Sequence, residues 1–246
     1  MRIAVAGGTG VVGRYVVEAV SAAGHEPVVL ARSRGVDLTT GAGLDAALDG
    51  VSAVVDVSNV TTLSRRTAER FFVLAAKNLL TAARRAGVGH HVLLSIVGVD
   101  RSPLGYYRAK LRQEEVVLSG PVPATVLRAT QFHEFVDQTL ARVPGPLALV
   151  PRMRIQPVAA SEVASHLVGI ATREPRSRAA DLAGPEVHDL VDLARQVSTA
   201  RGLRRPVVPV RFGRAMADGS LLPTEDGPRG RIRFAHWLAE AVTPPG

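Results

Sequence analysis

The chain has 246 residues, 46% of them hydrophobic and 21% charged, a composition typical of a folded globular protein with one large domain. It contains no cysteine, which excludes disulfides and thiolate chemistry and favours a cytoplasmic location. No apolar stretch is long enough to cross a membrane, and the N-terminus lacks a secretory pattern. We therefore expect a soluble protein without a membrane partner.

The formal net charge is +8, so a nucleic-acid partner has to be considered. The arginines are scattered along the chain, and aromatic residues make up only 4% of it. No predicted helix carries a dense basic face interleaved with aromatic side chains. We expect no nucleic-acid partner, and the positive charge is compatible with a phosphate-bearing cofactor.

The N-terminal half alternates short apolar runs with segments of helical periodicity. The pattern predicts strands at residues 2–7, 27–34, 52–59, 90–98 and 123–129. It predicts helices at residues 11–24, 45–48, 65–86 and 106–118. Apolar strands separated by amphipathic helices are typical of a parallel sheet covered on both faces. We therefore expect an α/β fold with a doubly wound parallel sheet of the Rossmann type.

After residue 130 the pattern becomes less regular, and several prolines separate short extended pieces. Helical periodicity returns at residues 161–172, 189–200 and 229–242, the last around Trp237. We expect residues 1–150 to form the doubly wound domain. Residues 151–246 would form a small C-terminal segment on the substrate side, packed on the same core.

A glycine loop, GGTGVVG at residues 7–13, joins the first predicted strand to the first predicted helix. Gly7 would allow the tight turn, Gly10 the close approach of a pyrophosphate, and Gly13 the close packing of helix on strand. Backbone N–H groups and the positive helix end would then face the phosphates. The strand–turn–helix context indicates a dinucleotide-binding domain at residues 1–150.

The end of the second strand indicates which dinucleotide is bound. A site selective for NAD places a carboxylate there, but this chain has Arg32, Ser33 and Arg34, with no carboxylate before Asp37. Guanidinium groups and a hydroxyl suit a 2′-phosphate, so we expect NADP(H). Surface arginines at a strand end are the alternative. Asp37 would accept a hydrogen bond from the adenine amino group, or it would stabilise a turn or a helix start.

Several motifs in order resemble the short-chain dehydrogenase/reductase superfamily, and within it the atypical NmrA-like branch. They are GGTGVVG, ARSR, GVDLTT, DVSNV, NLLTAARRAGVGHHVLLSIVGVD, YYRAKLRQEEVVLSGPVPATVLRATQFHEF and IQPVAASEVA, over roughly residues 1–170. The resemblance implies an NAD(P)-binding oxidoreductase. The expected cofactor contacts are Gly7, Thr9, Gly10, Val11, Val12, Gly13, Arg32, Ser33, Arg34, Asp37, Ser58, Asn59, Ser95 and Lys110.

The resemblance also implies three catalytic residues, Ser95, Tyr106 and Lys110. Tyr106 and Lys110 are four positions apart and share a helix face. Lys110 would hold the nicotinamide ribose and lower the phenol pKa, Tyr106 would donate a proton, and Ser95 would bind the same substrate oxygen. Ser95 is closer to Tyr106 in sequence than in the superfamily's mainstream catalysts. The alternatives are a Tyr106 that packs on the sheet and an ion pair between Lys110 and Glu114.

A second cluster, Gln131, Phe132 and His133, follows the strand at 123–129 and would contact the substrate. Alternatively, Phe132 anchors a loop on which His133 is exposed. No metal-ligand spacing occurs, so we expect no metal.

Three functions remain open on the sequence alone. The first is an NADPH-dependent reductase of a small carbonyl or quinone-like substrate. The others are a catalytically silent NADP(H)-binding redox regulator and an isomerase that uses the nucleotide structurally. The sequence carries no signal for the oligomeric state.

Overall fold

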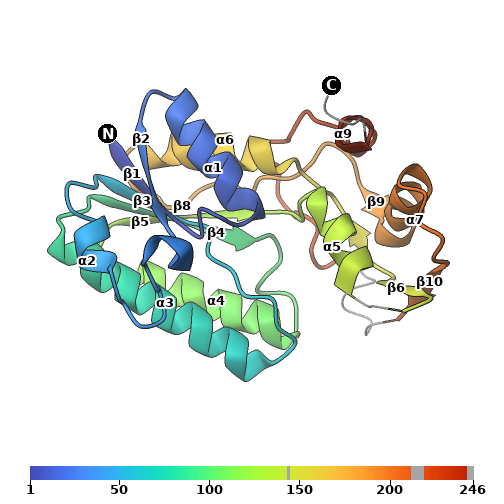
Figure 1. Ribbon diagram of the computed structural model, residues 1–246, viewed down its shortest axis with the longest axis horizontal. Helices are drawn as coiled ribbons and strands as arrows, with labels where there is room; N and C mark the ends of the chain where they lie inside the picture. The colour runs from blue at the N-terminus through green and yellow to red at the C-terminus, as the bar shows by residue number, and fades with distance from the viewer. Residues whose placement is uncertain (143–144, 212–218, 243–246) are drawn as a thin grey trace.

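The computed structural model describes residues 1–142, 145–211 and 219–242 (Figure 1). In these ranges a six-stranded parallel sheet has the order β2-β1-β3-β4-β5-β8. Its strands are β1 (Arg2–Ala6), β2 (Glu26–Leu30), β3 (Ala53–Asp56), β4 (His90–Ile96), β5 (Ala124–Ala129) and β8 (Ser177–Arg178). The strand order reverses direction between β1 and β3, as the predicted doubly wound fold requires. The predicted fold class is confirmed.

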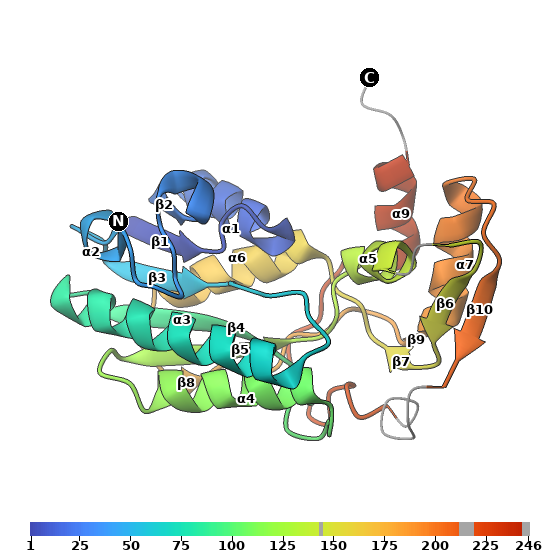
Figure 2. The ribbon, with the colours of Figure 1, turned by 60° about the horizontal axis from the view of Figure 1, so that its bottom comes forward.

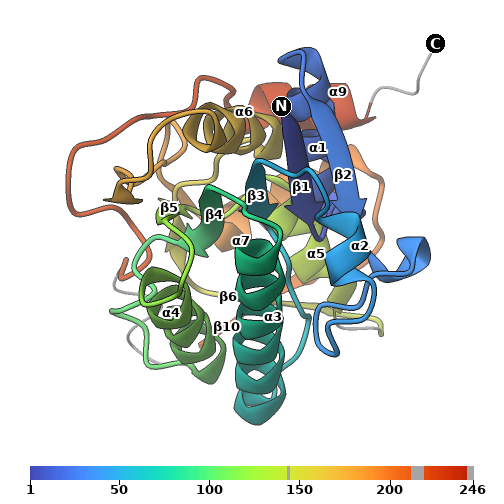
Figure 3. The ribbon, with the colours of Figure 1, turned by 90° about the vertical axis from the view of Figure 1, so that its left-hand side faces the viewer.

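Helices cover both faces of this sheet. They are α1 (Val11–Ala22) and α6 (Ala160–Ala171) on one face, and α2 (Leu44–Ala47), α3 (Arg65–Arg85) and α4 (Gly105–Leu118) on the other. Figure 2 shows α1 and α6 above the sheet and the α3–α4 pair below it, and Figure 3 shows the same layers along the strands. The sheet is therefore buried on both sides, which explains its near-continuous apolar strands.

Alternating side chains of the strands build two separate cores. Val5 of β1 packs with Val16 of α1 and Val163 of α6. Its neighbour Ala4 points the opposite way and belongs to the core that contains Leu79 of α3. This alternation follows from the two-residue repeat of a strand, and it fixes which helices lie on each face.

A second, smaller lobe packs beyond one end of the sheet, at the right of Figure 1. It contains α5 (Glu134–Arg142), α7 (Leu190–Ala200), α9 (Phe234–Val242), the parallel pair β6 (Ala148–Pro151) and β10 (Val207–Val210), and the antiparallel pair β7 (Arg154–Ile155) and β9 (His188–Asp189). A core of its own includes Val136, Val150, Leu193 and Phe234. α5 was not predicted from the sequence.

The chain passes back and forth between the two lobes. α6 and β8, which follow residue 150, join the main sheet, where α6 packs on α1 and β8 pairs with β5. Conversely, α5 and most of β6 lie in the part of the chain that was expected to form the main domain, but they contribute to the second core. The two cores are therefore interleaved along the sequence.

Two expected elements are shorter than the sequence indicated. The strand expected at 27–34 ends at Leu30, because residues Arg32–Arg34 form a 3-10 turn that closes on Gly35 with φ of +78°. The helix expected from 229 begins at Phe234. The preceding residues are extended, since Gly230 N–H donates to the carbonyl of Ala183. Within the described ranges, no helix is both long and apolar enough to span a bilayer.

Candidate functional site

A cleft of about 890 Å³ opens at the carboxyl-terminal edge of the sheet, beside the reversal of strand order. Gly7 after β1, Arg32 after β2, Ser58 after β3 and Ser95 at the end of β4 all contribute to its lining. The helices add Phe71 of α3, Tyr106 and Lys110 of α4, and Gln138 of α5. In doubly wound sheets this is the position of the ligand crevice.

The glycine loop has the backbone geometry that a phosphate-binding turn requires. Gly7 has a φ of +81°, a conformation that disfavours any side chain. A Cβ on Gly13 would lie 2.7 Å from the Cα of Gly8, so only glycine allows α1 to pack this closely on the turn. α1 begins at Val11 with no side-chain cap and no acidic residue in its first turn. Its positive end is therefore open to an anion.

The predicted residues of this loop all line the cleft, namely Gly7, Thr9, Gly10, Val11, Val12 and Gly13. Ser58 and Asn59, after β3, line it as well. The Ser58 hydroxyl is buried and has no hydrogen-bond partner among the described residues. Because buried hydroxyls normally have a partner, a ligand group in the cleft would satisfy it. The helix end, the glycine turn and this hydroxyl together fit a nucleotide diphosphate.

The turn after β2 separates the residues that were expected to bind a 2′-phosphate. Arg32 lines the cleft, whereas Ser33 and Arg34 are exposed and lie outside its lining. In a strand Arg32 and Arg34, two residues apart, would point to the same face, whereas in this 3-10 turn they point in different directions. Asp37 lines the cleft, and its Oδ1 accepts from the hydroxyl and the N–H of Thr39. These hydrogen bonds, helped by the charge of Arg32, lower the pKa of Asp37.

Tyr106 lies in the first turn of α4, and its hydroxyl donates a hydrogen bond to Oδ1 of Asn59 at 2.8 Å. Its ring packs edge-on against Phe72 of α3, with centroids 5.7 Å apart. The neighbouring Tyr107 packs against the core of the second lobe instead. α4 therefore presents the phenol of Tyr106, rather than that of Tyr107, to the cleft.

Lys110 follows one turn later on α4 and is only 5% exposed. Its Nζ donates a hydrogen bond to Oε1 of Gln113 at 2.7 Å and lies 4.9 Å from the centroid of the Phe72 ring. Burial lowers the pKa of Lys110 to about 8, although the carboxylates of Asp56 and Glu114 oppose this effect. The ammonium is therefore charged at neutral pH and loses its proton in mild base.

Ser95 is buried at the end of β4 and lines the same cleft. It is two residues from Leu93, which packs under α3 and α4, so the alternation of the strand directs Ser95 toward the face that carries α4. The structure thus brings Ser95, Tyr106 and Lys110 to one cleft, together with the glycine loop. Their roles in catalysis stay a prediction.

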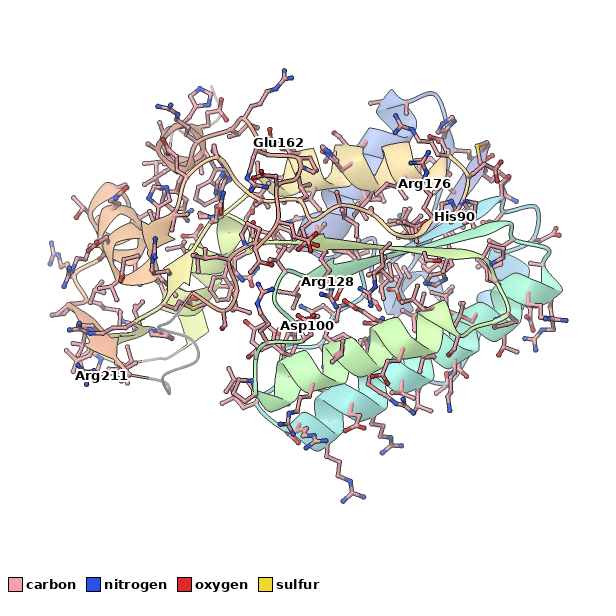
Figure 4. The ribbon with its side chains drawn as sticks, turned by 180° about the vertical axis from the view of Figure 1, so that it is seen from behind. His90, Asp100, Arg128, Glu162, Arg176 and Arg211 are labelled. Atoms are coloured by element: carbon pink, nitrogen blue, oxygen red, sulfur yellow. The ribbon has the colours of Figure 1, made fainter. Side chains whose placement is uncertain are left out.

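A buried ion-pair cluster fastens α4 to β5 and β8, at one edge of the sheet. Glu114 is fully buried and accepts hydrogen bonds from Arg128 of β5 at 2.9 and 2.8 Å and from Arg178 of β8 at 3.0 Å. Arg128 also pairs with Asp100, and Figure 4 shows these two side chains together between the sheet and α4. In the described chain Glu114 pairs with these arginines rather than with Lys110. The cluster holds the helix that carries both Tyr106 and Lys110.

The loop after β5 divides the three residues that were expected to contact the substrate. Phe132 lines the cleft. His133 is fully buried outside the lining, where its Nε2 lies 3.1 Å from the carbonyl oxygen of Ile232 and its ring contacts Phe234. Gln131 is also buried outside the lining. His133 does not reach the cleft, because the segment leading into α9 packs against it.

Sequence reasoning missed residues that reach the site from distant elements. Phe71 of α3 and Gln138 of α5 line the cleft. Gln113 accepts a hydrogen bond from Lys110 and donates one to Asp56. The position of Asp56 at the end of a buried strand was a usable signal, because a carboxylate is unusual in such a place. Nothing in the local pattern distinguishes Phe71 or Gln138 from other helix residues.

Residues 3–123 match the model of the NAD dependent epimerase/dehydratase family. A 138-residue segment is 31% identical to the chloroplastic divinyl chlorophyllide a 8-vinyl-reductase of Zea mays. That segment covers 46% of this chain and 34% of the reductase, so the match spans about a third of that relative.

Solved structures with similar folds cover nearly the whole chain. One is a short-chain dehydrogenase/reductase superfamily protein from Agrobacterium tumefaciens with bound NAD, at 20% identity and a TM-score of 0.69, covering 98% of this chain and 96% of that one. Another is the UDP-glucose 4-epimerase of Thermotoga maritima with UDP-glucose, at 13% identity and a TM-score of 0.78, covering 98% and 97%. These likenesses show the fold that the superfamily resemblance implies, while the NmrA-like branch stays a prediction. Residues 3–123 are thus similar to the NAD dependent epimerase/dehydratase family, and the whole chain has the fold of a solved short-chain dehydrogenase/reductase superfamily protein.

Proposed function

We propose that the protein is an NADPH-dependent oxidoreductase that reduces a small organic substrate with a carbonyl or quinone-like group. One observation carries this proposal. The cleft that contains the glycine loop and Arg32 also contains Ser95, Tyr106 and Lys110. A dinucleotide held by the loop would therefore extend toward a phenol and an ammonium, the groups that a proton transfer needs.

The residues of the cleft fit a nicotinamide dinucleotide, and three features favour its phosphorylated form. Ala31, directly after β2, offers no carboxylate for a ribose 2′-hydroxyl. Arg32 lines the cleft with a guanidinium suited to a phosphate. Asp37 already uses Oδ1 to hold Thr39 and Thr40. The structural neighbour from Agrobacterium contains NAD, so the preference for NADPH rests on Arg32.

The side chains of the cleft would prepare the substrate for a hydride supplied by the bound cofactor. The hydroxyls of Ser95 and Tyr106 would donate hydrogen bonds to the substrate oxygen, and Tyr106 would transfer its proton to that oxygen. The ammonium of Lys110 would lower the pKa of the phenol and bind the ribose. The hydroxyl of Tyr106 would release Asn59 and donate its hydrogen bond to the substrate instead. α5, which places Gln138 in the lining, would form part of the substrate side.

Turnover of NADPH with a panel of carbonyl and quinone compounds tests the proposal. We expect Tyr106→Phe to lower kcat by about 10²- to 10⁴-fold, the usual contribution of a positioned acid or base, and to leave NADPH affinity unchanged. Tyr107→Phe is the matched control, because Tyr107 packs in the second lobe, and it should keep full turnover. Equal rates for wild type and Tyr106→Phe would remove the proton-donor role.

A silent NADP(H)-binding regulator is the second candidate. It is favoured by the hydrogen bonds that Tyr106 makes to Asn59 and Lys110 makes to Gln113, which occupy both groups without a substrate. Tight NADPH binding with no oxidation by any compound of the panel would support it. Conversion of an added sugar nucleotide without net loss of NADPH would instead support the isomerase function.

A further inference from the structure

Two hydrogen bonds connect the ammonium of Lys110 to a carboxylate that does not line the cleft. Lys110 Nζ donates to Oε1 of Gln113 at 2.7 Å, and Nε2 of Gln113 donates to Oδ2 of Asp56 at 3.0 Å. Asp56 and Gln113 are fully buried, and Lys110 is 5% exposed. The three groups form a network inside the protein, below the surface of the cleft.

The chemistry of the two ends fixes the orientation of the amide between them. An ionised carboxylate can only accept hydrogen bonds, and an ammonium can only donate them. The amide of Gln113 must therefore turn its NH₂ to Asp56 and its carbonyl oxygen to Lys110. In this orientation both bonds are charge-assisted, and each is satisfied when Asp56 is ionised and Lys110 is protonated.

Among the groups that surround Lys110, Asp56 is the anion to which the hydrogen-bond network connects it. Phe72 on α3 offers a ring face, which favours a cation. Glu114 on α4 also favours the charged form of Lys110, but it is paired with Arg128 and Arg178 and makes no hydrogen bond to Gln113 or Lys110 among the described residues. On β4, burial lowers the pKa of His91, so its imidazole is neutral above mildly acidic pH and adds no charge.

Asp56 also organises the segment that faces Tyr106. Its Oδ1 accepts a hydrogen bond from the N–H of Ser58 at 2.9 Å, and the next residue, Asn59, accepts the hydroxyl of Tyr106. The carboxylate of Asp56 is therefore hydrogen-bonded to Gln113, which holds Lys110. It is also hydrogen-bonded to Ser58, whose neighbour Asn59 holds Tyr106.

We propose that Gln113 and Asp56 are positioning residues, which fix the ammonium of Lys110 in the cleft through two charge-assisted hydrogen bonds and favour its protonated form. The inference about charge concerns the protein alone, and its consequence for turnover rests on the proposed function of Lys110. The amide of Gln113 accepts a hydrogen bond from the ammonium and donates one to the buried carboxylate of Asp56, so its dipole is aligned between the two charges. Removing that polarity would make the buried lysine lose its proton at lower pH.

The lysine content of the chain allows a direct test without cofactor or substrate. Lys77 and Lys110 are the two lysines of the sequence, so protein labelled with ¹³Cε-lysine gives two side-chain NMR signals. Lys77→Arg assigns them, and the exposed Lys77 serves as reference. The chemical shift of the Lys110 signal against pH then reports its protonation.

We expect Gln113→Met, which keeps the volume but not the polarity, to lower the Lys110 midpoint by about one pH unit, a tenfold loss of proton affinity. Asp56→Asn should lower it as well. Gln113→Glu should leave the midpoint at or above that of wild type. This variant tests the proposal if Gln113→Met does not fold. Midpoints that agree among all folded variants, or a fall in Gln113→Glu as large as in Gln113→Met, would overturn the proposal.

A second experiment separates this inference from the proposed function. At pH 6, where Lys110 is charged in every variant, the NADPH affinity of Gln113→Met should be closest to that of wild type. The decline of kcat toward high pH should begin about one unit lower in the variant. If the NMR midpoints move but the protein neither binds nor oxidises NADPH, the proposed function fails and the positioning role stands. Profiles of kcat that coincide although the NMR midpoints differ would contradict the role of Lys110 in turnover, whereas midpoints that coincide would contradict the positioning role.

Discussion

At the scale of single residues, Lys110 carries the largest electrostatic cost of the site. An ammonium that is 5% exposed has lost most of its hydration, and its pKa falls to about 8 from the ordinary value of 10.5. Between these two values the unfolded chain binds more protons than the folded chain. The contribution of Lys110 to the free energy of unfolding therefore rises with pH across this interval, by roughly 3 kcal/mol in total.

This linkage predicts a difference between wild type and Lys110→Met in urea denaturation. From pH 8 to pH 10.5 wild type should gain up to roughly 3 kcal/mol of stability relative to the variant, and below about pH 6.5 the difference should be constant. Lys77→Met, at an exposed position of α3, controls for the loss of a lysine. A constant difference across the whole range would show that Lys110 does not change its proton affinity on folding.

At the scale of elements, periodicity predicted most of the sheet and its helices. α3 and β5 agree with the sequence within one residue at each end, because their apolar positions face a single large core. α5 escaped prediction since its nine residues pack against the small second core, where the apolar pattern is short. The strand expected at 27–34 was too long, because the Arg32–Arg34 turn depends on Gly35.

The packing of α1 on the glycine turn makes a second prediction. A methyl group on Gly13 would meet backbone atoms of Gly7 and Gly8, which cannot move aside as a flexible side chain would. Gly13→Ala should lower the free energy of unfolding by about 1–3 kcal/mol and weaken dinucleotide binding. Gly169→Ala in α6 is the control, because its methyl group meets open space and should raise stability by up to about 1 kcal/mol. Chemical denaturation measures both, and a Gly13→Ala protein as stable as wild type would contradict this packing.

At the scale of the whole molecule, the two lobes share chain segments. α6 and β8 complete the main sheet from beyond residue 150, and α5 reaches the cleft from the second lobe. This interleaving also explains which part of the site the sequence could predict. The glycine loop, Arg32 and the pair Tyr106–Lys110 are local patterns. Gln138, in contrast, meets them only through the tertiary fold, on which one sequence carries no direct information.

We predict that the interleaved lobes unfold together. Trp237, the chain's single tryptophan, lies in the second lobe, where it contacts Phe234. Its fluorescence therefore reports that lobe, while far-ultraviolet circular dichroism reports all the helices. The two signals should follow one urea transition with the same midpoint. A fluorescence change that precedes the loss of helix would show that the lobes are independent.

The binding of a nicotinamide dinucleotide to the cleft is the central claim, and calorimetric titration with NADPH and NADH tests it most directly. We predict one nucleotide per chain, with NADPH bound more tightly than NADH. Arg32→Ala should raise the NADPH dissociation constant by about 10- to 100-fold, since a hydrogen bond to a charged group contributes roughly 1.5–3 kcal/mol, and should leave NADH binding unchanged. Folded wild-type protein that binds neither nucleotide would contradict the claim.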